Sequence, residues 1–244
     1  MNIALVLSGG TGSRLGADIP KQYLEVNKKP IIAYCLETLS KSSDIDGIQI
    51  VADTTWQSQI QVWLGAADPE GKFRGFSLPG KTRQLSIYNG LESIRQYASD
   101  TDAVLIHDAA RPLLSQDLIH RCFIAMQDKV ASADAPTIHG VMPVLPMKDT
   151  VYCSEDGKHI SKLLDRKTIF AGQAPEIFPI GPYWEANVRL LPEEILAING
   201  STEPAILAGL EMVMIPGDER NFKITTAADL ERFREIVNHS EKGV

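Results

Sequence analysis

Glycines and basic residues gather within the first thirty positions of the chain. Residues 7–14 read L-S-G-G-T-G-S-R, with three glycines in four positions, and Lys21 follows in the tripeptide Pro20-Lys21-Gln22. Glycine reaches positive φ at little cost, and a backbone without Cβ lets amide N–H groups converge on an anion. Arg14 and Lys21 add two cations beside these amides. The pattern predicts a loop that binds the phosphates of a nucleoside triphosphate.

A dinucleotide-binding fingerprint does not explain this loop. That motif requires G-x-G-x-x-G, and Leu15 stands where the third glycine would follow Gly10 and Gly12. The plain alternative is a strand-to-helix turn that uses glycine for its geometry alone. Because short glycine patterns recur by chance, it is the nearby Arg14 and Lys21 that favour a phosphate site over such a turn.

Two further basic residues, Arg166 and Lys223, complete a candidate catalytic set with Arg14 and Lys21. Nucleotidyl transfer needs in-line positioning and neutralisation of charge on the transferred and leaving phosphates, and immobile Arg and Lys side chains supply both. A magnesium ion would bridge the nucleotide's own oxygens. The plain alternative is that each cation is simply solvated in its loop. Lys223 fits that alternative least, because it stands between two apolar residues.

Asp108 ends an apolar run and is the candidate metal ligand. Its carboxylate suits a ribose hydroxyl or magnesium, and the plain alternative is a cap of a helix or turn. His107 precedes it without an obvious catalytic partner, so we expect a buried, hydrogen-bonded imidazole. The five histidines show no metal-ligand spacing, and the chain has no G-x-S-x-G elbow for a nucleophilic serine.

Composition excludes several classes of protein. The 244 residues contain 44% hydrophobic and 23% charged side chains, as in an ordinary globular protein. A net charge of −7 argues against a nucleic-acid-binding protein, and no apolar stretch approaches the length of a membrane span. Cys35, Cys122 and Cys153 are too few and too scattered for a disulfide framework or a zinc site. With no secretory signal apparent, we expect a cytoplasmic protein.

Apolar patterning predicts the elements that position these residues. Short apolar runs predict strands at residues 3–7, 45–52, 73–78 and 103–106, and helical spacing predicts helices at residues 30–39, 55–64, 86–94 and 118–126. This alternation is typical of a doubly wound, Rossmann-like α/β fold with a mostly parallel sheet. The glycine loop, a second polar loop at residues 79–84 and a third at residues 107–112 all follow strands. Ligands of such sheets bind there, beyond the carboxyl ends of the strands.

The pattern changes after about residue 134. Strand-like segments at residues 137–144, 149–153, 158–164 and 168–171 predict a protruding β-arm at about residues 145–172. Such an arm seldom holds its shape alone, so we expect it to pack on a second copy of the chain. Helices are predicted at residues 181–190, 202–208 and 228–237, with a strand at residues 211–215. No linker interrupts the chain, which we interpret as a single domain spanning residues 1–244.

Eight segments together resemble the cytidylyltransferases that join CTP to a polyol phosphate. They are residues 9–14, 20–22, 80–86, 107–112, 148–150, 165–166, 172–175 and 222–225. One branch of that family uses 2-C-methyl-D-erythritol 4-phosphate and another uses ribitol 5-phosphate. The resemblance implies a nucleotidyltransferase fold of the GT-A type, magnesium as cofactor, and a homodimer that exchanges β-arms.

The resemblance also implies a role for each matching residue. The residues implied to hold CTP are Leu7, Ser8, Gly9, Gly10, Thr11, Gly12, Gly80, Lys81, Thr82, Arg83, Ser86, Asp108 and Ala109. Arg14 and Lys21 would stabilise the pentavalent transition state. The residues implied to place the polyol phosphate are Arg166, Lys223, Arg111, Thr150 and Thr202, of which Thr150 and Arg166 would serve the neighbouring subunit.

Two departures from the family pattern bear on the substrate. Ala174-Pro175-Glu176 stands where both branches carry Thr-Pro-Gln, and Ser201-Thr202-Glu203 stands where they carry Thr-Asp-Glu or Thr-Asp-Ala. We expect CMP transfer from CTP to 2-C-methyl-D-erythritol 4-phosphate, with ribitol 5-phosphate as the alternative acceptor. Two further alternatives are a nucleotide-binding module without turnover and a transferase that uses another base or a sugar 1-phosphate.

Overall fold

The computed structural model describes residues 1–10, 19–127 and 139–241. In this part of the chain, eight strands form one sheet in the order β10-β7-β11-β6-β1-β4-β5, with β12 paired to β7. The strands of this sheet are β1 (Asn2–Leu7), β4 (Gly47–Val51), β5 (Phe73–Ser77), β6 (Ala103–Asp108), β7 (Gly140–Pro146), β10 (Phe170–Gly172), β11 (Glu176–Pro179) and β12 (Met212–Pro216). The pairs β1–β4, β1–β6 and β4–β5 are parallel. The predicted mostly parallel α/β sheet is thus confirmed.

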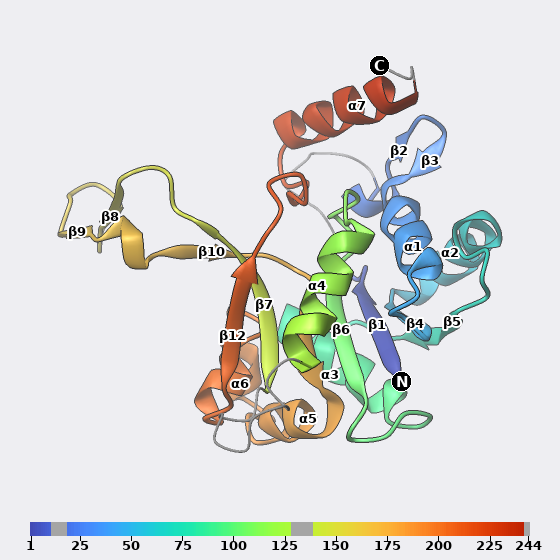
Figure 1. The fold of residues 1–244 in the computed structure, drawn as a ribbon, viewed down its shortest axis with the longest axis horizontal. Coiled ribbons are helices and arrows are strands. Elements are labelled where there is room, and N and C mark those ends of the chain that lie inside the picture. Colours follow the sequence, from blue (N-terminus) through green and yellow to red (C-terminus); the bar gives the residue numbers. More distant parts are fainter. Residues whose placement is uncertain (11–18, 128–138, 242–244) are drawn as a thin grey trace.

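Helices cover both faces of the sheet (Figure 1). The helices are α1 (Ile31–Lys41), α2 (Thr54–Ala67), α3 (Arg83–Ile94), α4 (Gln116–Gln127), α5 (Ile180–Val188), α6 (Glu203–Leu207) and α7 (Ala227–Glu241). Along β1, Ala4 and Val6 pack in one core with α1, α2 and α4, whereas Ile3 and Leu5 pack in another with α3, α5 and α6. Because successive side chains of a strand point to opposite faces, the continuous apolar run of β1 serves both cores.

Local sequence explains where several helices begin. Pro30 precedes the first residue of α1, where its missing N–H costs nothing. The side chain of Asp53 caps α2 by accepting a hydrogen bond from the Thr55 amide at 2.9 Å. Thr82 caps α3 in the same way, with its hydroxyl oxygen 3.2 Å from the Leu85 amide nitrogen. The last helix, α7, packs its buried Phe233 against Tyr34 of α1, and this contact fixes the C-terminal segment beside the sheet.

The sheet differs from prediction in one strand. The apolar patterning did not predict β11, which lies between β6 and β7 and runs antiparallel to both. Its four residues begin with Glu176 and end with Pro179, and both residue types are rare inside a strand. Burial on both faces of the sheet outweighs that low propensity.

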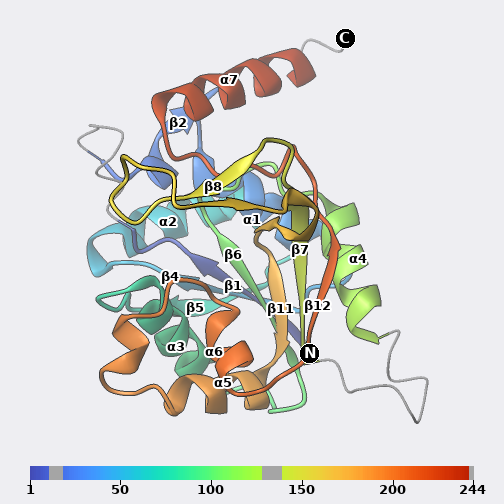
Figure 2. The ribbon, with the colours of Figure 1, turned by 90° about the vertical axis from the view of Figure 1, so that its left-hand side faces the viewer.

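A narrow arm extends from the sheet beyond β7 (Figures 1 and 2). It contains the hairpin of β8 (Val151–Cys153) and β9 (Lys162–Leu164), a short 3-10 helix (Arg166–Thr168) and β10. Tyr152, Ile160 and Leu163 of the arm are each more than half exposed. The position of the arm agrees with the predicted residues 145–172.

The described residues also form a 3-10 helix at Lys21–Tyr23, a strand pair of β2 (Glu25–Val26) and β3 (Lys29–Pro30), and a 3-10 helix at Glu194–Leu196. Within the described ranges, the helices fall short of the length and apolar character that a bilayer crossing needs.

Candidate active site

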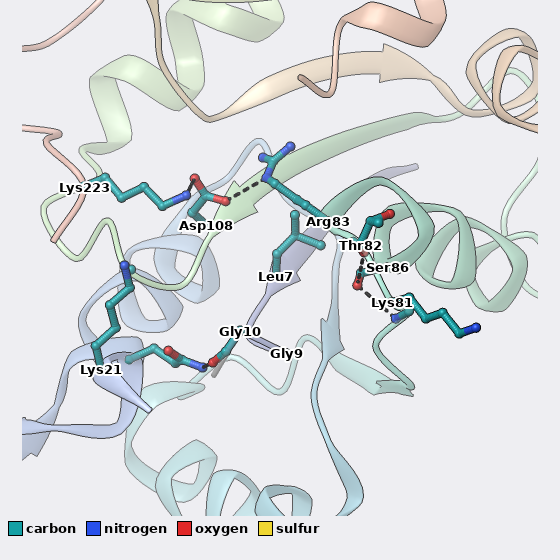
Figure 3. Close-up of a pocket in the computed structure, with 13 residues that line it drawn as sticks. Leu7, Gly9, Gly10, Lys21, Lys81, Thr82, Arg83, Ser86, Asp108 and Lys223 are labelled. Carbon is teal, nitrogen blue, oxygen red and sulfur yellow. Dashed lines mark hydrogen bonds and ion pairs between the residues drawn. The ribbon is translucent and has the colours of Figure 1, made fainter. Parts of the chain in front are cut away.

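A cavity of about 470 Å³ opens at the carboxyl ends of β1 and β6 (Figure 3). The lining residues are Leu7, Gly9, Gly10, Lys21, Gln22, Gly80, Lys81, Thr82, Arg83, Ser86, Asp108, Ala110 and Lys223. They come from all three polar loops that follow predicted strands and from the C-terminal segment before α7. A cavity therefore lies at the edge of the parallel sheet where a ligand was expected to bind.

Backbone forms one wall of the cavity. Gly9 follows β1, and a Cβ there would collide with the ring of Pro79, so only glycine permits the glycine loop to approach the second loop. Gly80 is equally constrained, since a Cβ there would lie 2.6 Å from the Cβ of Leu85. The Gly80 amide donates a hydrogen bond to the Ser86 hydroxyl at 3.0 Å. The two glycine-bearing loops therefore pack against each other and form one wall of the cavity together.

Asp108 lies at the floor of the cavity among three cations. Its Oδ1 is 3.2 Å from Nε of Arg83, and its Oδ2 is 3.0 Å from Nζ of Lys223 and 3.5 Å from Nε of Arg111. Figure 3 shows Lys223 and Arg83 approaching the carboxylate from opposite sides, whereas Lys81 points away from it. Burial opposes the charged form, but the three cations outweigh it and hold the pKa of Asp108 well below its usual range.

A second buried carboxylate, Glu176, lies behind Arg83. Its Oε1 accepts a hydrogen bond from the Ser201 hydroxyl at 2.6 Å, and its Oε2 is 3.9 Å from Nη2 of Arg83. Burial raises the pKa of Glu176 despite the attraction of Arg83. Arg83 thus links a carboxylate on the cavity floor, Asp108, to one in the interior.

His107 is fully buried beside the site. Its Nε2 is 3.0 Å from the carbonyl oxygen of Arg111, which can only accept, so Nε2 carries the proton and donates. Burial lowers the pKa of His107 to about 4, and the imidazole is therefore neutral at pH 7. The expected buried, hydrogen-bonded role of His107 is confirmed.

The structure brings most of the predicted nucleotide-binding residues to one cavity. Eleven predicted residues line it, namely Leu7, Gly9, Gly10, Lys21, Gly80, Lys81, Thr82, Arg83, Ser86, Asp108 and Lys223. Ser8, Ala109 and Arg111 lie just behind this lining: Ser8 and Ala109 are buried, and Arg111 reaches the cavity through Asp108. Thr11, Gly12 and Arg14 lie outside the described residues.

Three residues predicted to place the polyol phosphate lie elsewhere. Thr150 and Arg166 line a separate hollow on the arm, where Arg166 donates a hydrogen bond to the Lys148 carbonyl at 2.9 Å. Within one chain they do not reach the cavity. Thr202 precedes α6 and does not line the cavity either, whereas its neighbour Ser201 contacts Glu176. A single chain therefore does not unite the four predicted catalytic cations.

Residues 75–82 read G-F-S-L-P-G-K-T and fit the P-loop pattern G-x-x-x-x-G-K-[ST]. The structure does not use them in that way. Gly75 lies inside β5, paired with Gln49 of β4, and Lys81 points away from the anion-binding side of the cavity. The match is one of sequence spacing alone.

The described part of the chain offers no cluster of three or more potential metal ligands. Asp108, the predicted ligand, already has both carboxylate oxygens beside cations, and a metal ion there would meet Arg83, Lys223 and Arg111. These residues do not fit a protein-held magnesium ion.

Sequence reasoning missed three features of the site. It did not predict the bridge from Asp108 through Arg83 to Glu176, the pairing of Glu176 with Ser201, or the contacts of Gln22 with the glycine loop. The contacts of Gln22 could have been predicted from its position next to Lys21.

The chain is similar to known cytidylyltransferases over nearly its whole length. The sequence model described as "IspD: 2-C-methyl-D-erythritol 4-phosphate cytidylyltransferase" matches residues 2–239. The chain is 33% identical to the 2-C-methyl-D-erythritol 4-phosphate cytidylyltransferase of Geobacter metallireducens, over 93% of each chain. It is 29% identical to the ribitol-5-phosphate cytidylyltransferase of Streptococcus agalactiae, over 99% of this chain and 97% of that protein.

Solved structures show the same fold. A 4-diphosphocytidyl-2C-methyl-D-erythritol synthase superposes with a TM-score of 0.75 at 25% identity, over 97% of this chain and 98% of that one. The synthase from Anaerococcus prevotii gives a TM-score of 0.79 at 22% identity, over 97% and 96% of the two chains.

Proposed function

The chain belongs to the IspD family of 2-C-methyl-D-erythritol 4-phosphate cytidylyltransferases, and we propose that it transfers CMP from CTP to that polyol phosphate. The products are a CDP-polyol and pyrophosphate. The observation that carries the proposal is the shared cavity, in which two glycine-bearing loops face Lys21, Arg83 and Lys223 at the rim of the parallel sheet.

The reaction exchanges one P–O bond for another. An oxygen of the polyol's phosphate attacks the α-phosphorus of CTP, the bond from that phosphorus to the bridging oxygen breaks, and pyrophosphate leaves with the electron pair. A phosphate monoester is largely deprotonated at pH 7, so the attacking oxygen needs no general base. The neutral, buried His107 is consistent with a site that needs none.

The protein's contribution is positioning and charge. In this proposal Lys21 lies with the phosphates of CTP and Lys223 with the attacking phosphate, where both neutralise charge that grows in the transition state. Arg14 would assist Lys21. Asp108 and Arg83 would contact the ribose or base, with Glu176 behind them. Magnesium, where it takes part, would bind the phosphate oxygens of CTP itself, because the described residues offer it no ligand set of their own.

The arm suggests a homodimer. We propose that it packs on a second copy of the chain and brings Thr150 and Arg166 to the neighbour's cavity. Two facts support this: the arm exposes Tyr152, Ile160 and Leu163, and Arg166 lies away from its own cavity. Buried free thiols at Cys35 and Cys122 suit the reducing cytoplasm that we propose as its location.

Ribitol 5-phosphate remains the second candidate acceptor, since the Streptococcus agalactiae relative named for it aligns over nearly the whole chain. A panel assay of pyrophosphate release separates the candidates. With CTP, we expect the highest kcat/KM for 2-C-methyl-D-erythritol 4-phosphate. A preference for ribitol 5-phosphate would reassign the acceptor, and a preference for UTP over CTP would reassign the nucleotide. Binding of CTP without release for any acceptor would indicate a module without turnover.

A further inference from the structure

The side chain of Gln22 binds the backbone of the glycine loop at two points. It is only 4% exposed, and its amide Nε2 lies 2.7 Å from the Ser8 carbonyl oxygen and 2.8 Å from the Gly10 carbonyl oxygen. A side-chain amide nitrogen carries two hydrogens, so each carbonyl receives one.

Tyr23 adds a second restraint on the same peptide. Its phenol donates a hydrogen bond to the Ser8 carbonyl at 2.9 Å and accepts one from the Ser8 hydroxyl at 2.9 Å. The Tyr23 ring is itself fixed, because it is buried and packs against the tilted ring of Trp56 with 4.4 Å between ring centroids. The 3-10 helix Lys21–Tyr23 is thus anchored to the core on one side and to the glycine loop on the other.

These contacts decide which backbone atoms face the cavity. In a planar trans peptide, the carbonyl of one residue and the N–H of the next point in opposite directions. Gln22 and Tyr23 hold the Ser8 carbonyl to their side, and they therefore turn the Gly9 N–H to the other side. Carbonyl oxygens carry partial negative charge and repel phosphate, whereas amides attract it. Gly9 and Gly10 both line the cavity, so this orientation governs its affinity for an anion.

We propose that Gln22 is a positioning residue for the triphosphate of CTP, holding the Ser8 and Gly10 carbonyls away from the phosphates. The inference rests on the proposed function, because it takes the ligand of the cavity to be a nucleoside triphosphate. Lys21 is the adjacent residue and lines the same cavity, so the contact also fixes the distance between that cation and the loop.

The test measures CTP binding and turnover in Gln22→Met, which keeps the length of the side chain and removes both donors. Losing two hydrogen bonds to the loop should raise the dissociation constant and KM for CTP about tenfold. KM for the polyol phosphate should change less than about twofold, because that substrate does not contact the glycine loop in the proposed arrangement. A loss confined to stability would leave both KM values unchanged.

Gln49→Met is the matched control. Gln49 is 2% exposed, donates to the Ser77 hydroxyl at 2.9 Å and accepts from Tyr97 at 3.2 Å, but it does not line the cavity. The Gln49→Met variant should have a lower melting temperature and an unchanged KM for CTP. If Gln22→Met does not fold, Tyr23→Phe decides: it keeps the ring and removes one restraint on Ser8, so the CTP dissociation constant should rise about threefold.

Calorimetry of the wild-type protein with CTP separates the two possible failures. Absence of CTP binding by the wild type would contradict the proposed function. Wild-type binding with unchanged CTP affinity in both Gln22→Met and Tyr23→Phe would overturn the positioning role alone. An equal loss of affinity in Gln49→Met would overturn it as well, because a general loss of stability would then explain the effect.

Discussion

Asp108 lies beside cations from three parts of the chain. Arg83 comes from the start of α3, Arg111 from the loop after β6, and Lys223 from the segment before α7. The carboxylate keeps these like charges together in a partly buried site, where they would otherwise repel one another. It also leaves the cluster with a net positive charge, which suits an anionic ligand.

We predict that Asp108→Asn destabilises the protein by about 3 kcal/mol, or roughly 6–12 °C in Tm, because three cations lose their counter-ion. Sulfate or CTP should restore more of the Tm in this variant than in the wild type, since an anion can replace the missing charge. Thermal unfolding with and without sulfate measures both effects. Asp117→Asn, which breaks the exposed pair with Arg121, should change Tm by less than about 1 °C. Equal stability of the two variants would contradict the role of Asp108.

Lys21 is the described member of the pair predicted to stabilise the transition state. We predict that Lys21→Ala folds normally and lowers kcat at least about a hundredfold, because a preorganised charge is lost. Steady-state pyrophosphate release measures this loss. Lys41→Ala, at the exposed end of α1, is the control and should keep full turnover. Near-normal kcat in Lys21→Ala would exclude the role.

At the scale of elements, the loop before α7 positions Lys223. Lys223 owes its position to side chains outside the cavity. The amide of Gln173 exchanges two 3.0 Å hydrogen bonds with the backbone of Asp218, and Asn221 donates to the Ala174 carbonyl at 2.6 Å. Arg111 donates to the Asn221 carbonyl at 2.8 Å. The segment after β10 therefore holds the loop that carries Lys223.

If the arm of one subunit completes the site of the other, two inactive variants should complement each other. We predict that Lys21→Ala and Arg166→Ala, unfolded and refolded together in equal amounts, regain about a quarter of wild-type activity, because each mixed dimer contains one intact site. Each variant refolded alone is the control and should stay inactive. Failure of the mixture to regain activity, with mixed dimers present by mass spectrometry, would contradict the shared site.

At the scale of the whole molecule, the anion site contrasts with its surroundings. The chain carries a net charge of −7, so its overall field repels anionic substrates, and the cluster of Lys21, Arg83 and Lys223 must attract them locally. Salt screens the long-range repulsion more strongly than the local attraction, because partly buried charges are screened less than exposed ones.

His107 and Asp229 are two of the groups whose lowered pKa values affect the acid stability of the protein. The unfolded chain protonates His107 near its ordinary pKa of 6.5, but burial lowers the folded value to about 4. The unfolded state therefore binds more protons between these values, and stability falls as pH drops from 6.5 to 4, by about 3 kcal/mol in total.

Asp229 accepts hydrogen bonds from Thr225 and Thr226, which outweigh burial and lower its pKa to about 2. Its contribution is present above pH 4 and is lost as pH falls through 2.

We predict that Tm is nearly constant between pH 7 and 8 and declines between pH 6.5 and 4. Calorimetric scans across this range measure the decline, which His107→Gln should flatten because the titrating imidazole is gone. His120→Gln, at an exposed position, should retain the full decline. A wild-type Tm that does not change between pH 6.5 and 4 would contradict the burial of a neutral His107.

Short-range sequence patterns determined several of the elements. The apolar run of β1, the glycines after it and the caps at Asp53 and Thr82 specify a strand, a loop and two helix starts within a few residues each. The alternation of strands and helices up to residue 127 then allows few arrangements other than a parallel sheet. This is why a ligand site at the rim of the sheet could be predicted from the patterning, whereas most of the eleven predicted residues that line the cavity were implied only by the resemblance to a known family.

Tertiary structure alone decided what those signals do not contain. Glu176 begins a strand of low intrinsic propensity that forms because both of its faces are buried, and it contacts Ser201. Thr202, predicted to place the substrate, does not line the cavity. Two of the cations beside Asp108 are distant in sequence, Arg83 by 25 positions and Lys223 by 115, and charge pairing over such separations depends on the folded path of the chain. Arg166 and Thr150 match the family motif, but the direction of the arm takes them away from the cavity of their own chain. Residue types reveal which chemistry is available, whereas the packing of distant segments determines which groups meet.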